Sequence, residues 1–447
     1  MSRVPVIYLE CTATFRFDHG TGIQRVVRNV IRYFQKLAPM RGFDVVPIYF
    51  ERGQYYRAPT KPDGSLLSLA EGPNRHSRRL RVRRVLDHLT RSLPGAARDF
   101  VAAPSTSPGL ARSARAILAP LGHLRRALGP AENRTPVVIA ADDILLHVDL
   151  SADSGMHARL AALRAQGTFI CAIINDLIPL RISEIWPPSF VVNFRLWIDC
   201  MIANCDCIFT ISRATKGDVE RYRNELPATS HPPSQTIEWF HLGHDMDVTD
   251  ATGTARGPLR DIFAAGVPVL LNVGWLDPRK NQRGLIAALA QLHRRGVRAK
   301  LLLVGKKGMD ADAVFADIHA NPQVARDIHM FHDLTDAELQ FAFTHARALV
   351  YPSFAEGFGL PLVEALMHRM PVFASDIPVF HEVAGDHAVY FDPFDVSALA
   401  NILEAYLVRG ELPASKTAAP FHWMSWEQSV ACLFDLLQQS LPRKVAA

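Results

Sequence analysis

The chain has 447 residues, which is enough for about two to four domains of ordinary size. Hydrophobic residues account for 49% of it and charged residues for 21%, and the formal net charge is +5. These values exclude a largely disordered chain, a collagen and a coiled coil. No apolar run approaches the roughly 18 residues that a membrane-spanning helix needs, and the six cysteines contain no CxxC pair. We therefore expect a folded, water-soluble protein of the reducing cytoplasm.

In the first half of the chain, short β-branched runs alternate with stretches of helical periodicity. The strand signals lie at residues 4–9 and 43–50, resume at Val137, and return at residues 168–174 and 207–211. The helical signals lie at residues 22–37, 156–166, 190–204 and 215–222. This alternation predicts a parallel sheet covered by helices.

A basic segment interrupts this first series. Residues 51–135 are rich in Arg, Pro, Gly and Ser, which predicts an insertion between core elements. Between Arg75 and Arg126 there are twelve arginines and two aspartates, a local charge of +10. Such a segment could bind anionic lipids at the inner face of the cytoplasmic membrane, or it could be a solvated surface insertion. Nucleic acid is disfavoured, because no aromatic residue for base stacking lies between Arg75 and Arg98.

A second alternating series follows residues 245–260, whose Thr, Gly, Asp and Pro content is typical of a linker. Thr335 and Glu338 have the spacing of a capping box. We expect a first domain at residues 1–250, a second at 251–420 and a terminal helix at 421–447, with the ligand in the cleft between two doubly wound sheets. The strands of the second domain are predicted at residues 269–273, 300–304, 348–351, 372–374 and 388–391.

The residues with the clearest chemistry follow the strand predicted at 348–351. Gly357 and Gly359 turn the chain before an apolar helical run. N–H groups at a helix start attract anions, and glycine lets a ligand approach the backbone, so this stretch predicts a phosphate or sugar cradle. Glu364 lies within the apolar helix, where a carboxylate needs donors such as the hydroxyls of a ribose. Glu356, taken alone, could equally be a loop acid that faces water.

The segment EGFGLPLVE, which contains both glutamates, resembles the signature of retaining glycosyltransferase family 4. The resemblance implies an α/β protein of the GT-B fold, in which two Rossmann-like doubly wound domains face each other across a cleft. It also implies that Glu356 holds the donor hexose and Glu364 the ribose. The donor-binding residues between them would be Gly357, Phe358, Gly359 and Leu360.

The segment GWLDPRKN at residues 274–281 is similar to another loop of the same family. Lys280 matches the lysine that neutralises the donor diphosphate, and Arg279 stands beside it. Trp275 stands where the family often has arginine, so we expect diphosphate binding to depend on Lys280 with help from Arg279.

Three segments of the first half resemble cleft loops of the family. The stretch at residues 20–26 contains Gly22 and is similar to the glycine loop near the donor phosphate. Asn175 and Asp176 lie where many relatives have His or Tyr followed by aspartate. Asp176 is the candidate that binds the acceptor hydroxyl or relays its proton, with Asn175 at the acceptor, although Asp176 could also be a turn cap. Ser212 resembles a serine near the cleft, or is an ordinary N-cap.

The carboxyl-terminal stretch from Phe421 resembles the last helix of the family, which crosses back onto the first domain. We expect its apolar side chains to be core contacts, namely Trp423, Trp426, Leu433 and Phe434.

Two other short patterns resemble metal-binding motifs, but we do not expect them to bind a ligand. Asp245 and Asp247 match an acid-x-acid metal pattern of the other major glycosyltransferase fold, yet they lie at the linker, so we expect neither a metal nor a cofactor. Cys205 and Cys207 precede or begin a strand and are interpreted as packing residues.

Together the residues and the resemblance predict a retaining, metal-independent hexosyltransferase. Its catalytic residues would be Asp176, Glu356 and Lys280. The donor would be a nucleotide diphosphate sugar, with GDP-mannose as the expected choice, and the acceptor a hydroxyl of a glycan or lipid-linked glycan in bacterial surface-polysaccharide synthesis. Two alternatives stay open: a GT-B-fold epimerase of nucleotide sugars, and a catalytically silent member that acts as a scaffold.

Overall fold

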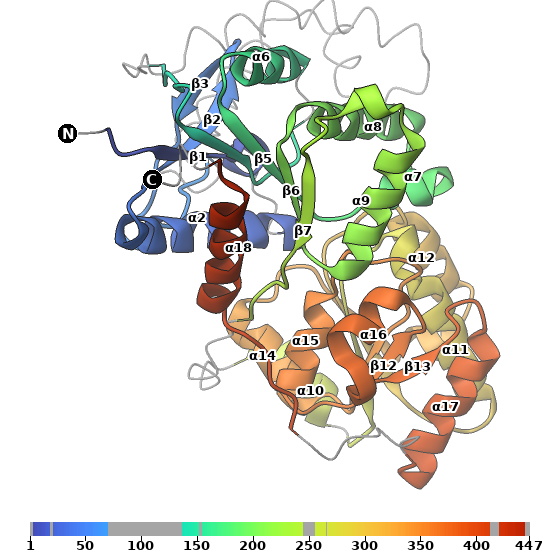
Figure 1. The fold of residues 1–447 in the computed structure, drawn as a ribbon. Helices are drawn as coiled ribbons and strands as arrows, with labels where there is room; N and C mark the ends of the chain where they lie inside the picture. The colour runs from blue at the N-terminus through green and yellow to red at the C-terminus, as the bar shows by residue number, and fades with distance from the viewer. Residues whose placement is uncertain are drawn as a thin grey trace, which may run out of the picture.

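The computed structural model shows two α/β domains, each built around one sheet (Figure 1). It describes residues 3–17, 21–69, 136–151, 154–244, 255–264, 266–411 and 420–442. The basic segment from Arg75 to Arg126 and the pair Asp245 and Asp247 lie outside the described residues.

The first domain contains a seven-stranded sheet with the order β3-β2-β1-β4-β5-β6-β7. The described strands are β1 Val6–Glu10, β2 Asp44–Glu51, β3 Gln54–Arg57, β4 Ile144–His147, β5 Phe169–Ile174, β6 Cys207–Thr210 and β7 Thr236–Trp239. Neighbouring strands are parallel except for β2 and β3, which form an antiparallel hairpin. The described helices are α1 Thr12–Arg16, α2 Gly22–Leu37, α6 Ser154–Ala165, α7 Ile178–Arg181, α8 Pro188–Asn204 and α9 Arg213–Glu225, with short 3-10 turns η1 Ala38–Arg41, η2 Ser183–Ile185 and η3 Ala228–Ser230.

The second domain contains a six-stranded parallel sheet with the order β10-β9-β8-β11-β12-β13. Its described strands are β8 Val269–Val273, β9 Lys300–Val304, β10 Ile328–Phe331, β11 Ala348–Tyr351, β12 Val372–Ser375 and β13 Val389–Phe391. Its described helices are α10 Gly257–Ala264, α11 Gln282–Arg294, α12 Ala311–His319, α13 Pro322–Ala325, α14 Asp336–His345, α15 Leu360–Met367, α16 Pro378–Ala384 and α17 Val396–Arg409, with 3-10 turns η5 Pro278–Lys280 and η6 Gly385–His387.

The central strands follow the expected physical rule. In β5 all six residues are buried, and in β4, β9, β11 and β12 every residue is buried. Helices cover both faces of a parallel sheet, so its central strands are nearly continuous apolar runs. This is why the sequence predicts β5, β9, β11 and β12 correctly, and the predicted fold class is confirmed.

Three strands, β3, β7 and β10, were not predicted from the sequence. β7 buries only Ile237 fully, β10 has only half-buried positions, and β3 is a four-residue hairpin edge, so none forms an apolar run. The strand signal at Val137 is wrong, because β4 begins at Ile144. The insertion expected from residue 51 contains β3, and the linker expected up to Arg260 overlaps α10.

The last described helix, α18 Trp426–Ser440, returns to the first domain and lies beside α2 (Figure 1). The ring of Phe434 lies 5.1 Å from Phe34 and 5.8 Å from Phe43. Trp426 and Leu433 are also fully buried, and the half-buried Trp423 donates its indole N–H to the Leu242 carbonyl at 2.7 Å. The predicted return of this helix and its core contacts are confirmed.

Chain order reverses beside β1 in the first sheet, between β2 and β4, and beside β8 in the second, between β9 and β11. Loops at the carboxyl ends of strands next to such reversals form the ligand sites of doubly wound sheets. Within the described residues, no helix is both long enough and apolar enough to cross a bilayer.

Candidate active site

Two loops of the second domain carry the predicted donor residues, and the sheet brings them together. β8 and β11 are neighbours, and their loops start at the same edge. After β8, the side chain of Asp277 caps η5 by accepting from the amide of Arg279. The Arg279 carbonyl in turn accepts from the amide of Phe354 in the loop after β11, at 2.8 Å. This backbone contact fixes Arg279 and Lys280 beside Glu356.

The carboxylate of Glu356 lies at the centre of the resulting cluster. The Arg279 guanidinium donates to it at 2.7 Å, the hydroxyl of Ser353 donates at 2.8 Å, and the ammonium of Lys280 forms an ion pair with it. Lys280 also donates to the hydroxyl of Tyr351 at 2.8 Å and lies over its ring. Glu356 is therefore a paired, buried acid, and the alternative of a loop acid facing water does not apply.

Burial and charge act on this cluster in opposite directions. Burial favours the protonated acid, but Arg279 and Lys280 outweigh it and hold the pKa of Glu356 at about 2. Burial lowers the pKa of Lys280 to about 8, although Glu356 opposes the shift. At neutral pH Glu356 is ionised and Lys280 is protonated. Arg279 and Lys280 are therefore both cations beside this buried acid, and Asp176 and Asp277 also act on the charge of Arg279.

Glu364, on α15, is buried, as the sequence predicts, and its partner comes from the other domain. Arg25, on α2, forms an ion pair with the Glu364 carboxylate; the side chain of Arg25 is 29% exposed and that of Glu364 is 3% exposed. The hydroxyls of a ribose were the partner expected for this carboxylate from the sequence. In the structure, a guanidinium from the segment that resembles the phosphate loop supplies the hydrogen bonds that burial requires.

The acceptor candidates follow β5 in the first domain and face this cluster. Asp176 accepts from the amide of Ile178 at 3.0 Å, so it does cap the turn into α7. Burial raises the pKa of Asp176, while the charge of Arg279 across the cleft opposes the rise. The side-chain oxygen of Asn175 is buried and has no hydrogen-bond partner among the residues that the structure describes.

Ser212 and Gly357 connect the two domains directly. Ser212 caps α9 by accepting from the amide of Thr215, and it also donates to the Gly357 carbonyl at 2.8 Å. Thr215 donates to the same carbonyl at 3.3 Å. A β-carbon built on Gly357 would lie 2.3 Å from the Asn175 carbonyl oxygen. Gly357 therefore lets the backbone of the first domain approach closely, where the sequence had suggested the approach of a ligand.

The remaining predicted donor residues are placed in three ways. Gly22 begins α2, directly after the Thr21 cap, one turn before Arg25. Gly359 has a φ of 101°, which favours glycine, and leads into α15 at Leu360. Phe358 is buried between the rings of His241 and Trp423, so its side chain belongs to the domain interface.

Four residues of the site were not assigned a role from the sequence: Arg25, Thr215, Tyr351 and Ser353. Tyr351 and Ser353 flank the recognised loop, and their proximity to Glu356 in the chain was a usable signal. Arg25 and Thr215 gave no such signal, because their partners lie 339 and 142 residues away.

An open cavity of about 680 Å³ lies beside Glu356 at the domain interface. The first domain lines it with Arg181, Arg213 and Arg221, and the second with Ile377 and His381. Within the described part of the chain, no three potential metal ligands gather at one place.

Comparison with known proteins agrees with this geometry. Residues 261–417 match the model of the family described as glycosyl transferases group 1. Most of the second domain therefore carries the pattern of this family. The matched residues include the loops after β8 and β11, and therefore Lys280, Glu356 and Glu364.

Relatives of this chain include bacterial O-antigen enzymes. It is 32% identical to the serotype-specific mannosyltransferase WbdA of Escherichia coli over 312 residues, which are 69% of this chain and 38% of WbdA. It is 46% identical to the O-antigen chain mannosyltransferase RfbU of Salmonella typhimurium over 241 residues, which are 51% of this chain and 59% of RfbU. The chain thus spans well under two thirds of the length of these relatives.

Solved structures match the fold over nearly the whole chain. Sucrose-phosphate synthase from Thermosynechococcus elongatus has a TM-score of 0.60 at 17% identity and covers 97% of this chain and 98% of its own. Anabaena HepE, solved in complex with UDP and glucose, has a TM-score of 0.56 at 14% identity and covers 98% and 100%. At this level of identity the likeness establishes the GT-B arrangement of two Rossmann-like domains.

Proposed function

We propose that this protein transfers mannose from GDP-mannose to a hydroxyl of a glycan, with retention of the anomeric configuration, in the synthesis of a bacterial surface polysaccharide. The observation that carries the proposal is the buried cluster of Glu356 with Arg279 and Lys280, with Asp176 of the other domain facing it. The named mannosyltransferases among the relatives support mannose, and their O-antigen role supports a glycan acceptor.

The cations would stabilise the leaving group. When the bond between the anomeric carbon and the diphosphate breaks, negative charge develops on the phosphate oxygens, and fixed positive groups lower the barrier most when they are already in place. Lys280 and Arg279 are held in place by Glu356 and by the backbone contact between their loops. We propose that these two cations and the amides at the start of α15 carry this charge without a metal.

The acid Glu356 suits hexose binding better than nucleophilic attack. Its pKa of about 2 and its two cationic partners make it a weak nucleophile. In the proposed reaction the acceptor oxygen attacks the anomeric carbon on the face that the diphosphate leaves, and its proton passes to the leaving phosphate. Asp176 would orient the acceptor hydroxyl, since its burial favours a hydrogen-bonding carboxyl at the cleft.

Glu364 would bind the donor ribose, and the proposal then requires Arg25 to share or exchange this carboxylate when the nucleotide binds. An arginine released from Glu364 at the start of α2 would lie next to the predicted phosphate loop. Donor binding would thus draw the first domain onto the nucleotide.

The test is a donor and acceptor screen with the purified chain. GDP-mannose, UDP-glucose and dTDP-rhamnose are incubated with and without a mannose-terminated oligosaccharide, in the presence of EDTA, and released nucleotide and elongated product are measured. The proposal predicts GDP release that depends on the acceptor, and an α-linked product by NMR. Use of another donor would change the assigned sugar, a new nucleotide sugar without acceptor would indicate an epimerase, and no turnover with any donor would favour the silent scaffold.

We also propose that the enzyme works at the inner face of the cytoplasmic membrane on a lipid-linked glycan. The support is the local charge of +10 between Arg75 and Arg126. Sedimentation with vesicles that contain anionic phosphatidylglycerol tests this, with deletion of residues 75–126 as the comparison. Equal sedimentation of both proteins would reject a membrane role for the segment.

A further inference from the structure

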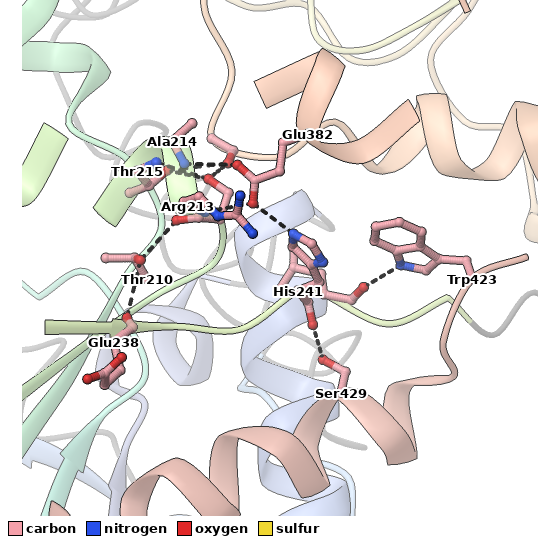
Figure 2. Close-up of polar contacts among 12 residues, drawn as sticks. Thr210, Arg213, Ala214, Thr215, Glu238, His241, Glu382, Trp423 and Ser429 are labelled. Carbon is pink, nitrogen blue, oxygen red and sulfur yellow. Dashed lines mark hydrogen bonds and ion pairs between the residues drawn. The ribbon is translucent and has the colours of Figure 1, made fainter. Parts of the chain in front are cut away.

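A carboxylate of the second domain caps a helix of the first. Glu382 lies on α16, and its two oxygens accept from the amides of Arg213 at 2.7 Å and of Ala214 at 2.9 Å, the first two residues of α9 (Figure 2). First-turn amides have no partner within their own helix and carry its positive end. Ser212 satisfies only the amide of Thr215. Glu382 therefore completes the cap of α9 from the opposite domain.

A histidine holds this carboxylate from another direction. The Nε2 atom of His241 lies 2.7 Å from Glu382, and the His241 ring lies among those of Trp239, Trp423 and Phe358 at 4.8, 5.2 and 5.9 Å. The carbonyl of His241 accepts from Ser429 on α18 at 2.6 Å (Figure 2). His241 is thus fixed by the first domain, the second domain and the terminal helix. Burial disfavours the Glu382 carboxylate, but His241 and the two amides bind it and lower its pKa.

The loop that carries Glu356 docks on the same turn of α9. Ser212 and Thr215 bind the Gly357 carbonyl, one residue after Glu356. Two successive loops of the second sheet, after β11 and after β12, therefore meet one helix end of the first domain. Displacement of Glu382 would leave the amides at the start of α9 without this partner. It would also weaken the contacts by which Ser212 and Thr215 hold the Glu356 loop.

We propose that Glu382 is a positioning residue for the transfer reaction: through the amides of α9 and through His241, it holds the two domains at the spacing in which Glu356 and Asp176 face one substrate. We call Glu382, His241 and the amides of Arg213 and Ala214 the interdomain clasp. The inference rests on the proposed function, because it assigns the clasp to that reaction. It goes beyond a role of Glu382 in the stability of α16, because both amides from which the carboxylate accepts belong to α9 of the other domain.

The main variant is Glu382→Gln, which keeps the shape but removes the charge. The matched control is Glu404→Gln, since Glu404 pairs with Arg295 at 2.8 Å within the second domain. A hydrogen bond to a charged group contributes enough that its loss should lower kcat about tenfold or more. GDP affinity by calorimetry should change less than about threefold, because the nucleotide-binding loops are intact. The control should keep the wild-type kcat.

A second pair of variants tests the capping route itself. Proline is tolerated at the first position of a helix, so Arg213→Pro removes the amide hydrogen that Glu382 accepts and keeps α9. Arg213→Ala controls for the lost side chain, which lies over the Trp239 ring at 5.0 Å. We expect Arg213→Pro to lower kcat relative to Arg213→Ala, and to add little in the Glu382→Gln background.

Small-angle X-ray scattering in the presence of GDP provides a readout that needs no turnover. The clasp predicts a larger radius of gyration for Glu382→Gln than for wild type, with an unchanged value for Glu404→Gln. An active wild type with unchanged kcat in Glu382→Gln, or full additivity with Arg213→Pro, would overturn the inference. An inactive wild type would instead reject the proposed function, and equal radii in scattering would then decide against the clasp.

Discussion

Replacement of Gly357 by alanine isolates the contact between the domains from the fold of either one. Gly357 is not among the glycines with positive φ, so its backbone accepts alanine. The three atoms nearest to an added β-carbon all belong to the first domain: the Asn175 carbonyl oxygen at 2.3 Å, the Asp176 β-carbon at 3.1 Å and the Asn175 carbonyl carbon at 3.3 Å. The added methyl group therefore presses on the opposite domain.

The size of the effect follows from these distances. Ordinary van der Waals contact begins at 3.4 Å, so the loop and Asn175 must separate by about 1 Å. The Asn175 carbonyl lies 3.4 Å from the Thr215 hydroxyl, whose single hydrogen it shares with the Gly357 carbonyl. The same movement lengthens the Ser212 and Thr215 bonds to the Gly357 carbonyl, now 2.8 and 3.3 Å, beyond hydrogen-bond range. Two such bonds contribute about 2 kcal/mol, which corresponds to a decrease of roughly 30-fold in the closed form.

The assay compares kcat with thermal stability. We expect kcat of Gly357→Ala to fall roughly 30-fold, in proportion to the closed form. The unfolding midpoint should stay within about 2 °C, since contacts inside each domain persist. The matched control is Gly217→Ala on α9, where the nearest atom to the added carbon is 3.7 Å away. The control should keep kcat and stabilise the helix by about 0.5–1 kcal/mol. A wild-type kcat in Gly357→Ala would show that the contact between Gly357 and Asn175 does not control the closed form.

Three further predictions concern charge and packing. Because the pKa of Lys280 is lowered from 10.5 to about 8, its charge is lost as the pH rises through that value, and GDP affinity should fall by up to about tenfold per pH unit above it. In calorimetry, Lys280→Arg should show a weaker dependence of GDP affinity on pH, because arginine keeps its charge. A steep fall of GDP affinity in this variant would contradict the role of Lys280. Burial, with the charge of Glu10, raises the pKa of Asp149 from 3.8 to about 7. The folded state therefore binds this proton more tightly than the unfolded state does. The free energy of unfolding should decline by at most about 4 kcal/mol as the pH rises from about 4 to about 7. Thermal scans of Asp149→Asn should lose that part of the slope, and an identical slope would disprove the cause. Phe434→Ala removes a ring packed against Phe34 and Phe43 and should cost about 3–5 kcal/mol in urea unfolding, whereas replacement of the exposed Cys432 by serine should leave the unfolding free energy unchanged.

The layers of the fold and the second-domain half of the site were predictable from local sequence patterns and from the resemblance to a known family. Buried parallel strands are continuous apolar runs, so β5, β9 and β11 are separable from the helices by local pattern. The position of β4, which was expected at Val137, and the less apolar strands β7 and β10 are not. Glu356 and Gly357 share one loop, and Lys280 lies in a loop of the same sheet. The resemblance of both segments to loops of one family predicted that they meet, and the neighbouring positions of β8 and β11 in the sheet bring them together.

Tertiary structure alone decided how the two halves meet. The pairs of Arg25 with Glu364 and of the Arg213 amide with Glu382 join residues 339 and 169 positions apart. No periodicity or spacing encodes such partners, because they depend on how one domain is placed on the other. This placement also decides why residue 357 is a glycine: a side chain there would collide with the backbone of Asn175 in the other domain. A local pattern specifies which groups a loop presents, whereas the closure of the domains decides which groups they contact.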